Sequence, residues 1–388
     1  MKILAIETSC DETAVSILEA EGDTSGATYK VLGDALFSQA SLHAEYGGVY
    51  PNLAKREHQK NLVPLTIRAL TEADLFSVAD PIKNDHVATF NGIREEEFRK
   101  TVSDFVSRYK RPDIDLIVVT KGPGLEPALW TGVTFAESLS QAWDIPLLGV
   151  DHMEGHIVSA LCGGGDDTEY EIRNTKFPLL ALLISGGHTE FVLMKSWFEY
   201  ELIGRTKDDA IGEAYDKVAR LLDLPYPGGP EIDKSAARAR ARAAQHDITF
   251  PRPLAHDDTC DFSFSGLKTA VLYKLQKMPR LTPEDKEHVA QAFEDAAVEV
   301  VLIKTKRALE KTMAKTLAVG GGVANNTAIR SGLTNLVAQD FPETTLNLPD
   351  RKLTGDNAIM IGIAGHLRHA SGHTHEGPLS VSGSQTLS

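Results

Sequence analysis

The stretch "KILAIETSCDETAVSILEA", residues 2–20, holds two apolar segments joined by a tight polar turn. Both segments are short and rich in β-branched or aliphatic residues, which favour strands. A third segment of this kind, "YKVLGDALFSQ", follows at residues 29–39 after another polar break. The chain is therefore predicted to open on a meander of three strands.

The same meander pattern returns in the second half of the chain. "FPLLALLISGG" (177–187), "HTEFVLMKS" (188–196) and "YELIGRTKD" (200–208) are again three short segments with polar or glycine-bearing breaks. After each meander, helical and strand-like segments alternate, which is typical of mixed sheets flanked by helices. We therefore expect a duplicated α/β fold of two similar lobes with a cleft between them.

The composition is that of a globular protein. Of the 388 residues, 42% are hydrophobic and 24% are charged, and no apolar stretch is long enough to cross a bilayer. The sequence begins directly on an apolar strand, which leaves no room for a secretory signal. Three widely spaced cysteines without a CxxC pair suit a reducing compartment. We expect a cytoplasmic protein that has no contact with membranes.

The net charge of −14 argues against nucleic-acid binding by bulk attraction. A chain of this charge needs a local basic patch or a basic partner to handle RNA. Two helical stretches offer such patches, although a solvated helix surface is the favoured explanation for each patch alone. They carry Lys55, Arg56 and Lys60 in the first stretch and Arg238, Arg240 and Arg242 in the second.

Two polar turns occupy equivalent positions in the repeated units and are candidates for binding phosphate. They are "ETSCDET", Glu7 to Thr13, and "SGGHTE", Ser185 to Glu190. Such turns present backbone N–H groups and hydroxyls to anions. The stretch "GGGVANN", Gly320 to Asn326, is a third candidate because it follows a strand and opens a helix. It has neither the Gly-Lys-Ser/Thr of a P-loop nor the spacing of a dinucleotide fingerprint.

Further polar candidates lie on a predicted helix that precedes a glycine turn. Glu213 and Asp216 are three residues apart and share a helix face, and "YPGGPEID", which contains Gly229, follows. A solvated helix face explains the two carboxylates equally well.

His152 and His156 lie four residues apart in "VDHMEGHIVSAL", on a predicted helix, so both rings project from one face. That geometry suits one metal cation. Glu154, two residues after His152, points about 200° away from the histidine face and is badly placed to activate a metal-bound water. A third ligand must come from elsewhere, and Asp356 in "TGDNA" is attractive because it precedes a helix.

The motifs together resemble the TsaD family, the universal tRNA threonylcarbamoyladenosine transferases once labelled O-sialoglycoprotein endopeptidases. The resemblance covers nearly the whole chain. It departs from the family's usual pattern at Asn52, at Asp151 and in "GGVANN". The motifs that carry it occur in this order: "ETSCDET", "YGGVYPNLAKREH", "KGPGLEPALWTG", "DHMEGH", "SGGHTE", "GEAYDKVA", "YPGGPEID", "FSFSGLKTA", "GGGVANN" and "TGDNAIM".

The resemblance implies an actin/Hsp70-like fold of two duplicated lobes. It implies that His152, His156 and Asp356 hold one divalent metal per subunit, Fe²⁺ or Zn²⁺. It also implies a bound nucleotide, which is ATP, AMP or threonylcarbamoyl-adenylate. The residues implied to contact that nucleotide are Ile184, Ser185, Gly186, Gly187, His188, Asp216, Gly229 and Asn326, and possible further residues of the cleft are Ser9, Cys10, Glu12 and Glu213.

The implied reaction is acyl-type transfer. The threonylcarbamoyl group moves from its adenylate to N6 of the adenosine just 3′ of the anticodon in tRNAs that read ANN codons, and AMP leaves. The residues offer no serine or cysteine nucleophile with a base partner, so the catalytic residues stay unassigned. Implied partners are tRNA and, in bacteria, a TsaB-like paralogue and a TsaE-like ATPase, with a homodimer as the alternative.

The domain boundaries expected from these patterns divide the chain into four parts. The first lobe spans 1–155, with an insertion at about 74–111 that contains an amphipathic helix near 96–109. A second inserted stretch covers 163–175. The remaining parts are a second lobe at 176–350, a helix at 354–372 that carries the third metal ligand and packs back towards the first lobe, and a disordered tail at 373–388.

Three other functions remain open on the sequence. A metalloendopeptidase is suggested by the two histidines, although Glu154 opposes it. An actin-like kinase is suggested by the paired turns, although such kinases need no His/His/Asp cluster. A non-catalytic ATP-binding scaffold of a tRNA-modification complex is the third.

Overall fold

The computed structural model describes residues 1–78, 90, 92–166, 168–242, 246–278, 280–374, 378–384, 386 and 387. The chain forms two compact units, one from Met1–Asn174 with Asp356–Thr386 and the other from Thr175–Gly355. The predicted insertion at 74–111 and the predicted tail at 373–388 fall partly outside the described residues. No helix in the described ranges is long and apolar enough to span a membrane.

The first unit is built on a mixed sheet in the order β5-β4-β1-β2-β3-β7-β6. Strands β1, β2 and β3 pair antiparallel, whereas β4 pairs parallel with both β1 and β5. Its strands are β1 (Lys2–Glu7), β2 (Glu12–Glu21), β3 (Thr28–Ser38), β4 (Leu116–Gly122), β5 (Leu147–Asp151), β6 (Cys162–Asp166) and β7 (Glu169–Ile172). Its helices are α1 (Ala40–His43), η1 (Ala44–Tyr46), α2 (Pro51–Glu72), α3 (Glu96–Arg108), α4 (Glu126–Trp143), α5 (His152–Leu161) and α11 (Ala358–Ala370).

The second unit repeats the order of the first five strands. Its sheet runs β10-β9-β8-β11-β12, with the first three strands antiparallel and β11 parallel to both β8 and β12. Its strands are β8 (Leu179–Ile184), β9 (Thr189–Ser196), β10 (Glu199–Arg205), β11 (Thr316–Gly320) and β12 (Thr345–Asn347). Its helices are α6 (Ile211–Leu221), α7 (Gly228–Arg242), α8 (Ser265–Gln276), α9 (Pro283–Thr312), η2 (Gly322–Asn325), α10 (Thr327–Asp340) and η3 (Arg351–Leu353).

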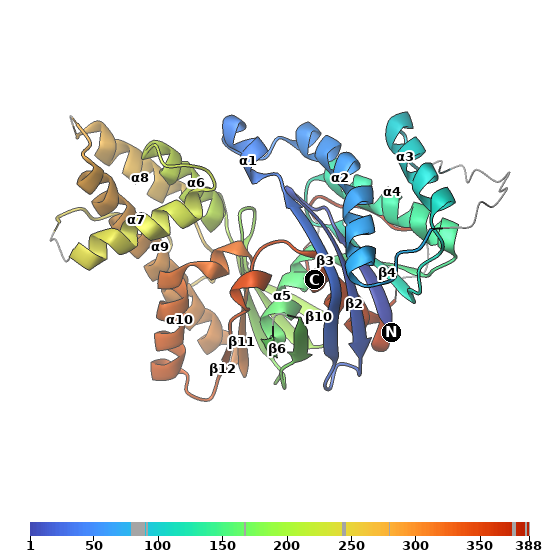
Figure 1. Ribbon diagram of the computed structural model, residues 1–388. Coiled ribbons are helices and arrows are strands. Elements are labelled where there is room, and N and C mark those ends of the chain that lie inside the picture. The colour runs from blue at the N-terminus through green and yellow to red at the C-terminus, as the bar shows by residue number, and fades with distance from the viewer. Residues whose placement is uncertain are drawn as a thin grey trace. The chain divides into compact units, whose positions relative to one another are not determined.

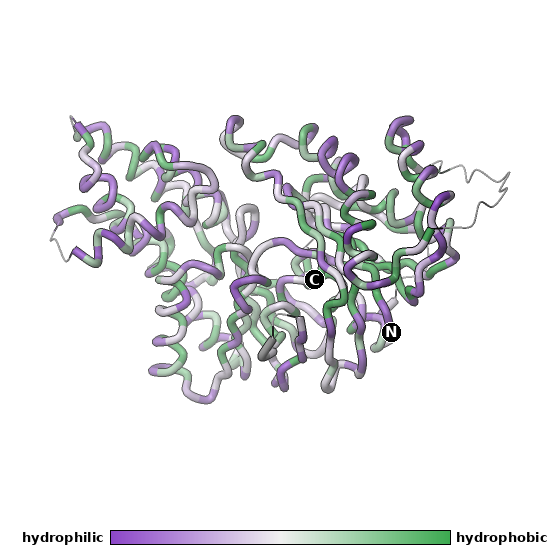
Figure 2. Tube along the Cα trace, viewed as in Figure 1, coloured by the Kyte–Doolittle hydropathy of each residue, from purple (hydrophilic) through white to green (hydrophobic). Residues whose placement is uncertain are grey.

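Five strands of each sheet follow one order, third-second-first-fourth-fifth. Helices flank the strands of each unit (Figure 1). This repeat confirms the predicted α/β fold of the duplicated actin/Hsp70-like type. The helix expected near 96–109 is α3, which buries Phe98, Val102 and Phe105 against the first core. Along α2 and α3, hydrophilic and hydrophobic residues alternate, as expected of helices that cover a sheet with one face (Figure 2).

Helices cover both faces of the first sheet. Helices α2, α3 and α4 contribute to the core on one face, and α11 contacts strands β1, β2 and β4. Strand β1 is accordingly buried along almost its whole length, which explains its continuous apolar sequence. This packing fixes the carboxyl-terminal ends of β1, β4 and β5, where the site described below begins.

Two segments differ from the sequence-based expectation. The glycine-rich stretch at 163–175 contributes to a hairpin of β6 and β7, which extends the first sheet beyond β3. In the tail that was expected to be disordered, Ser382 N–H donates to the carbonyl of Lys121 at 3.2 Å, and Leu379 packs against the first core. Backbone hydrogen bonds and two apolar side chains, Leu379 and Val381, therefore hold this part of the tail.

Candidate metal centre

The junction between β5 and α5 positions the two histidines. Strand β5 ends at Asp151, whose Oδ1 accepts hydrogen bonds from the backbone N–H groups of Met153 at 2.8 Å and Glu154 at 3.3 Å. This N-cap starts α5 at His152. The rings of His152 and His156 then lie one turn apart, with centroids separated by 4.7 Å.

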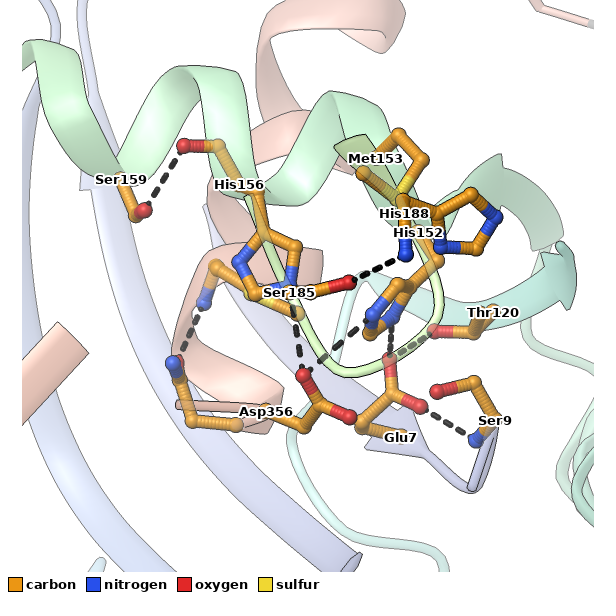
Figure 3. Close-up of polar contacts among 12 residues, drawn as sticks. Glu7, Ser9, Thr120, His152, Met153, His156, Ser159, Ser185, His188 and Asp356 are labelled. Carbon is orange, nitrogen blue, oxygen red and sulfur yellow. Dashed lines mark hydrogen bonds and ion pairs between the residues drawn. The ribbon is translucent and has the colours of Figure 1, made fainter. Parts of the chain in front are cut away.

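The carboxylate of Asp356 lies beside both rings, so it is available as a third donor. It lies just before α11, and its Oδ1 is 3.3 Å from Nε2 of His152 and 3.2 Å from Nε2 of His156 (Figure 3). The three donor atoms lie within 4.8 Å of one another. Two ring nitrogens therefore converge on one carboxylate oxygen.

Glu7 orients the first histidine from behind. Its Oε2 lies 2.9 Å from Nδ1 of His152 and accepts a hydrogen bond from Thr120 Oγ1 at 2.6 Å (Figure 3). Glu7 also accepts the backbone N–H of Ser9 through its other oxygen. A carboxylate on Nδ1 fixes the tautomer and leaves Nε2 free to bind a cation, which is the usual support of a metal-bound histidine.

The charges of the cluster set its protonation. Burial opposes ionisation of Asp356, but the charge and hydrogen bonds of the histidines outweigh burial and lower the pKa of that carboxyl. Burial likewise opposes ionisation of Glu7, and the charge of His152 nevertheless lowers its pKa. Burial lowers the pKa of His156. These shifts favour ionised carboxylates and a neutral His156, the forms that bind a metal. Burial opposes protonation of His152, but the charges of Asp356 and Glu7 outweigh burial and raise its pKa, so a metal that binds there displaces a proton.

The residues fit a divalent metal. His156 is fully buried, and neither of its ring nitrogens makes a well-formed hydrogen bond with any described residue. A buried imidazole without hydrogen bonds is costly unless it has another partner. Two imidazole nitrogens and one carboxylate oxygen form a donor set used by Zn²⁺ and by non-haem Fe²⁺, with coordination positions left open.

Glu154 does not belong to this cluster, in agreement with its helical angle. Its side chain is fully buried and pairs with Arg368 of α11 through two hydrogen bonds, at 2.5 and 2.8 Å. Glu154 is therefore unavailable as the general base that a metalloendopeptidase of the HExxH type needs.

The turn between β1 and β2 holds the other candidate residues of the first unit. Ser9 Oγ is buried and has no hydrogen-bond partner in the described ranges. The carbonyl of Cys10 contacts His58 Nε2 at 3.0 Å. Burial, with Asp11 and Asp356 adding to it, raises the pKa of Glu12 to about 9.

In the second unit, the predicted turn follows the carboxyl end of β8. Ile184 ends the strand, and the N–H of His188 donates to Ser185 Oγ at 3.1 Å. Side-chain positions at Gly186 and Gly187 face open space, with no heavy atom within 4 Å. A turn with unhindered backbone N–H groups suits an anionic ligand.

The glycine-rich loop after β11 packs against the same strand end. A side chain at Gly321 would meet the carbonyl of Ile184 at 2.3 Å, so only glycine permits this approach. Asn326 caps α10 by accepting from Ile329 N–H at 2.9 Å and donates to Glu294 at 2.7 Å. Its side chain therefore has a structural role in addition to the predicted ligand contact.

Helix α6 contacts the start of α7 beside another glycine whose side-chain position is open, Gly229. Asp216 Oδ1 accepts from Gly228 N–H at 2.7 Å, and the side-chain position of Gly229 is open. Glu213, in contrast, is half-exposed and forms an ion pair with Lys217 at 2.9 Å, the pairing expected of a solvated helix face.

Comparison of the sequence with known proteins assigns the chain to a family. The family model of TsaD, described as tRNA N6-adenosine threonylcarbamoyltransferase, matches residues 30–80 and 105–363. The chain belongs to the TsaD family. The unmatched residues 81–104 lie within the stretch that we expect to be an insertion.

Individual relatives agree with the TsaD assignment. Proteins named tRNA N6-adenosine threonylcarbamoyltransferase from Lacticaseibacillus casei and Lacticaseibacillus paracasei are each 38% identical over 96% of this chain and 93% of their own length. Among solved structures, a ROK hexokinase from Thermus thermophilus is 12% identical, with a TM-score of 0.42 over 96% of this chain and all of that one. A likeness this weak carries no argument.

Some residues around the TsaD-type site were missed by the sequence reasoning. Glu7 belongs to the turn "ETSCDET", but its contact with His152 was not predicted, because the two residues are 145 positions apart in the sequence. Arg368 was not considered, although it binds Glu154 across 214 residues. The sequence offers two local signals of such partners. Glu7 is a carboxylate at the end of a buried strand, and Glu154 is an acidic residue on an apolar helix.

Both predicted basic patches are largely neutralised by acidic neighbours. Lys55 pairs with Glu95 and Lys60 pairs with Glu57. Arg238 and Arg242 both contact Glu287, and Arg240 contacts Glu294 and Asp295. These side chains therefore offer little free positive charge to a tRNA backbone.

Proposed function

We propose that this chain is a tRNA N6-adenosine threonylcarbamoyltransferase that uses His152, His156 and Asp356 as the ligands of one divalent metal. The convergence of two Nε2 atoms on Asp356, with Glu7 orienting His152, carries the proposal. Family membership and 38% identity to transferases of that name support the substrate.

The transfer forms a bond between N6 of adenosine and the carbamoyl carbon, and breaks the bond from that carbon to the phosphate oxygen of the adenylate. AMP leaves with the electron pair, and the amine proton passes to water or to the phosphate. A bound Fe²⁺ or Zn²⁺ supplies Lewis acidity to the oxygens on which charge develops.

The chain's own residues hold the ligands in place. His152 and His156 are fixed by the capped helix α5, and Glu7 sets the direction of the His152 ring. We propose that the open turn at 184–188, Asp216, Gly229 and Asn326 hold the nucleotide, and that Ser9, Cys10 and Glu12 line the acceptor side. Positioning of donor and amine, rather than covalent catalysis, is then the main contribution of the protein.

The cellular setting follows from the same proposal. The enzyme acts on tRNA in the cytoplasm, together with a TsaB-like paralogue and a TsaE-like ATPase if the source is bacterial, or as a homodimer otherwise. Either arrangement supplies RNA-binding surface to a chain whose net charge is −14.

The test is nucleoside mass spectrometry of an unmodified ANN-reading tRNA. The reaction contains the full-length chain, ATP, threonine, bicarbonate, an adenylate-forming enzyme and the bacterial partner proteins. We expect threonylcarbamoyladenosine with the wild type and at least a 100-fold loss in His156→Ala, about the size reported for removing one strong catalytic electrostatic contact. Equal amounts of product from wild type and His156→Ala would show that the transfer does not need a metal at His156.

Absence of product from both chains would refute the transferase itself, provided that the partner proteins support a known homologue in the same mixture. Lys306→Gln, at an exposed ion pair with Asp340, serves as the matched surface control and should retain full activity.

A further inference from the structure

Two of the three residues between His152 and His156 contact α11. Glu154 forms its two hydrogen bonds to Nε and Nη2 of Arg368, and the carboxylate is fully buried. Bidentate pairing of this kind fixes the relative orientation of the two groups as well as their distance. The adjacent Gly155 lies so close to α11 that a Cβ there would be 3.0 Å from Met360 Cγ.

Helix α11 begins two residues after Asp356, and Asn357 caps it by accepting from Met360 N–H at 2.9 Å. The cap fixes the amino-terminal end of α11 relative to Asp356. The Glu154–Arg368 pair holds the other end of α11, three turns away, against the helix that carries both histidines. A shift of α11 along or away from α5 would therefore change the distance between Asp356 and the two Nε2 atoms.

We propose that Glu154 and Arg368 are positioning residues for the metal centre, setting the distance between Asp356 and the histidine pair without contacting the metal. This inference rests on the metal ligation proposed above. A buried ion pair is weak evidence for stability, since desolvation offsets much of its attraction. The pair lies between the two helices that carry the proposed ligands, and a positioning role explains that location better than a contribution to stability does.

The test measures metal binding by the purified full-length chain, with Zn²⁺ competed against a chromophoric chelator and Co²⁺ absorption as a report of geometry. We expect Arg368→Gln to weaken Zn²⁺ binding about 10- to 100-fold, the range typical of residues that support metal ligands, and to change the Co²⁺ spectrum. Arg252→Gln, which removes a more exposed, single-contact pair with Glu299 in the second unit, should bind Zn²⁺ as the wild type does.

The two failures can be told apart. If wild type binds no stoichiometric Zn²⁺, the proposed metal function fails. If wild type binds and folded Arg368→Gln keeps both the Kd, within twofold, and the Co²⁺ spectrum, only the positioning role fails. Should Arg368→Gln not fold, Arg368→Lys is judged by the same criterion, because it keeps the charge and loses the second hydrogen bond.

An independent observation concerns α8. Residues 262–283 contain four cationic side chains and no aspartate or glutamate, in a chain that carries 54 acidic residues. Within the described ranges, none of the four forms an ion pair of the kind that neutralises Arg238 and its neighbours. The four are Lys268, Lys274, Lys277 and Arg280.

The exposed face of α8 also carries an aromatic side chain. Tyr273 is 59% exposed and lies one turn from Lys277, which is exposed as well. Leu267 and Val271 face the core instead. Unpaired cations beside an exposed aromatic ring form the surface that binds a nucleic-acid backbone and stacks on an unpaired base.

We infer that the α8 surface, defined as Lys268, Tyr273, Lys274, Lys277 and Arg280, contacts the phosphate backbone of the tRNA substrate. This inference rests on the proposed function and names the surface by which its substrate is held. The half-buried Lys268 and Lys274 can extend their ammonium groups from either flank of the exposed face.

Fluorescence anisotropy with an ANN-reading tRNA transcript tests this surface. We expect Lys277→Gln/Arg280→Gln to weaken binding at least tenfold at low salt and to reduce the slope of log affinity against log salt by about two. Lys286→Gln/Lys306→Gln, which removes two cations that already have acidic partners, should leave both unchanged.

In the modification assay, the α8 variant should show a raised KM for tRNA with kcat retained. If wild type modifies tRNA while the variant keeps the same affinity, salt slope and KM, the surface assignment is wrong and the function stands. If wild type forms no threonylcarbamoyladenosine, the function itself fails.

Discussion

At the scale of single residues, hydrogen bonding distinguishes two fully buried histidines of the first unit, His156 and His58. His156 is buried beside a carboxylate and has no well-formed hydrogen bond in the described ranges. His58 is buried too, but its ring is satisfied by Thr13 Oγ1 at 2.7 Å and by the carbonyl of Cys10 at 3.0 Å. The same side chain therefore has a structural role in one place and the proposed metal-binding role in the other.

His58 gives a pH prediction. Burial lowers its pKa to about 4, below the value near 6.5 expected in the unfolded chain. The folded state thus binds fewer protons between these values, so the stability from neutral His58 is complete above about pH 6.5 and is lost as the pH falls towards 4. The loss amounts to roughly 3 kcal/mol at most.

Urea unfolding of wild type and His58→Gln at several values between pH 4 and pH 7.5 checks this. We expect the variant to lose part of the wild-type slope of unfolding free energy against pH. His369→Gln, at an exposed position, is the control and should keep the slope. Identical slopes in wild type and His58→Gln would contradict the prediction.

At the scale of elements, local periodicity predicted the parts of the site that lie close together in sequence. The four-residue spacing of His152 and His156 was sufficient to place both rings on one helix face, and the helical angle of Glu154 placed it away from them. The partners Glu7 and Arg368 were not predictable in this way, because they are brought in over 145 and 214 residues by sheet and helix packing.

The repeated meander likewise predicted the first three strands of each sheet, since alternating and apolar strand patterns are local. The β6–β7 hairpin was not predicted because "CGGGDD" has the composition of a loop. A glycine-rich strand lacks the alternation of apolar and polar side chains that predicts a strand. Strand pairing with β3, a long-range contact, is what orders Glu169–Ile172.

Gly155 gives a prediction at this scale. A methyl group there would lie 3.0 Å from Met360 Cγ and 3.1 Å from Ile361 Cδ1, so Gly155→Ala should push α5 and α11 apart. We expect a loss of about 1–3 kcal/mol in the free energy of unfolding, the usual cost of overpacking, together with weaker Zn²⁺ binding.

Chemical denaturation and Zn²⁺ competition check the two effects. Gly266→Ala in α8 is the matched control, because its side-chain position is open, and it should be neutral or slightly stabilising. Unchanged stability and unchanged Zn²⁺ affinity in Gly155→Ala would contradict the prediction, because they would show that α5 and α11 accommodate the added methyl group.

At the scale of the whole molecule, the first unit is assembled from two distant parts of the chain, Met1–Asn174 and Asp356–Thr386. The proposed metal ligands come from both parts, since His152 and His156 precede the second unit and Asp356 follows it. A bound metal would therefore link the two segments of the first unit, which local sequence patterns cannot reveal.

Metal removal should accordingly destabilise the folded chain. A ligand present at about 100 times its Kd adds about 2.7 kcal/mol to stability, so stripping the metal should lower the Tm by roughly 5–10 °C for a unit of this size. Calorimetry before and after chelation, and after Zn²⁺ is restored, measures the effect. In His156→Ala, chelation should leave the Tm unchanged; an equal shift in both proteins would point to a metal bound elsewhere.

The most direct test of the central claim is single-turnover transfer as a function of metal occupancy. Full-length protein is stripped and reloaded with graded amounts of Zn²⁺ or Fe²⁺, its metal content is measured, and it is mixed with ¹³C-labelled threonylcarbamoyl-adenylate, tRNA and partner proteins. Labelled threonylcarbamoyladenosine per chain should rise in proportion to bound metal in wild type and stay at background in His156→Ala. Full product from the stripped wild-type protein would contradict the account.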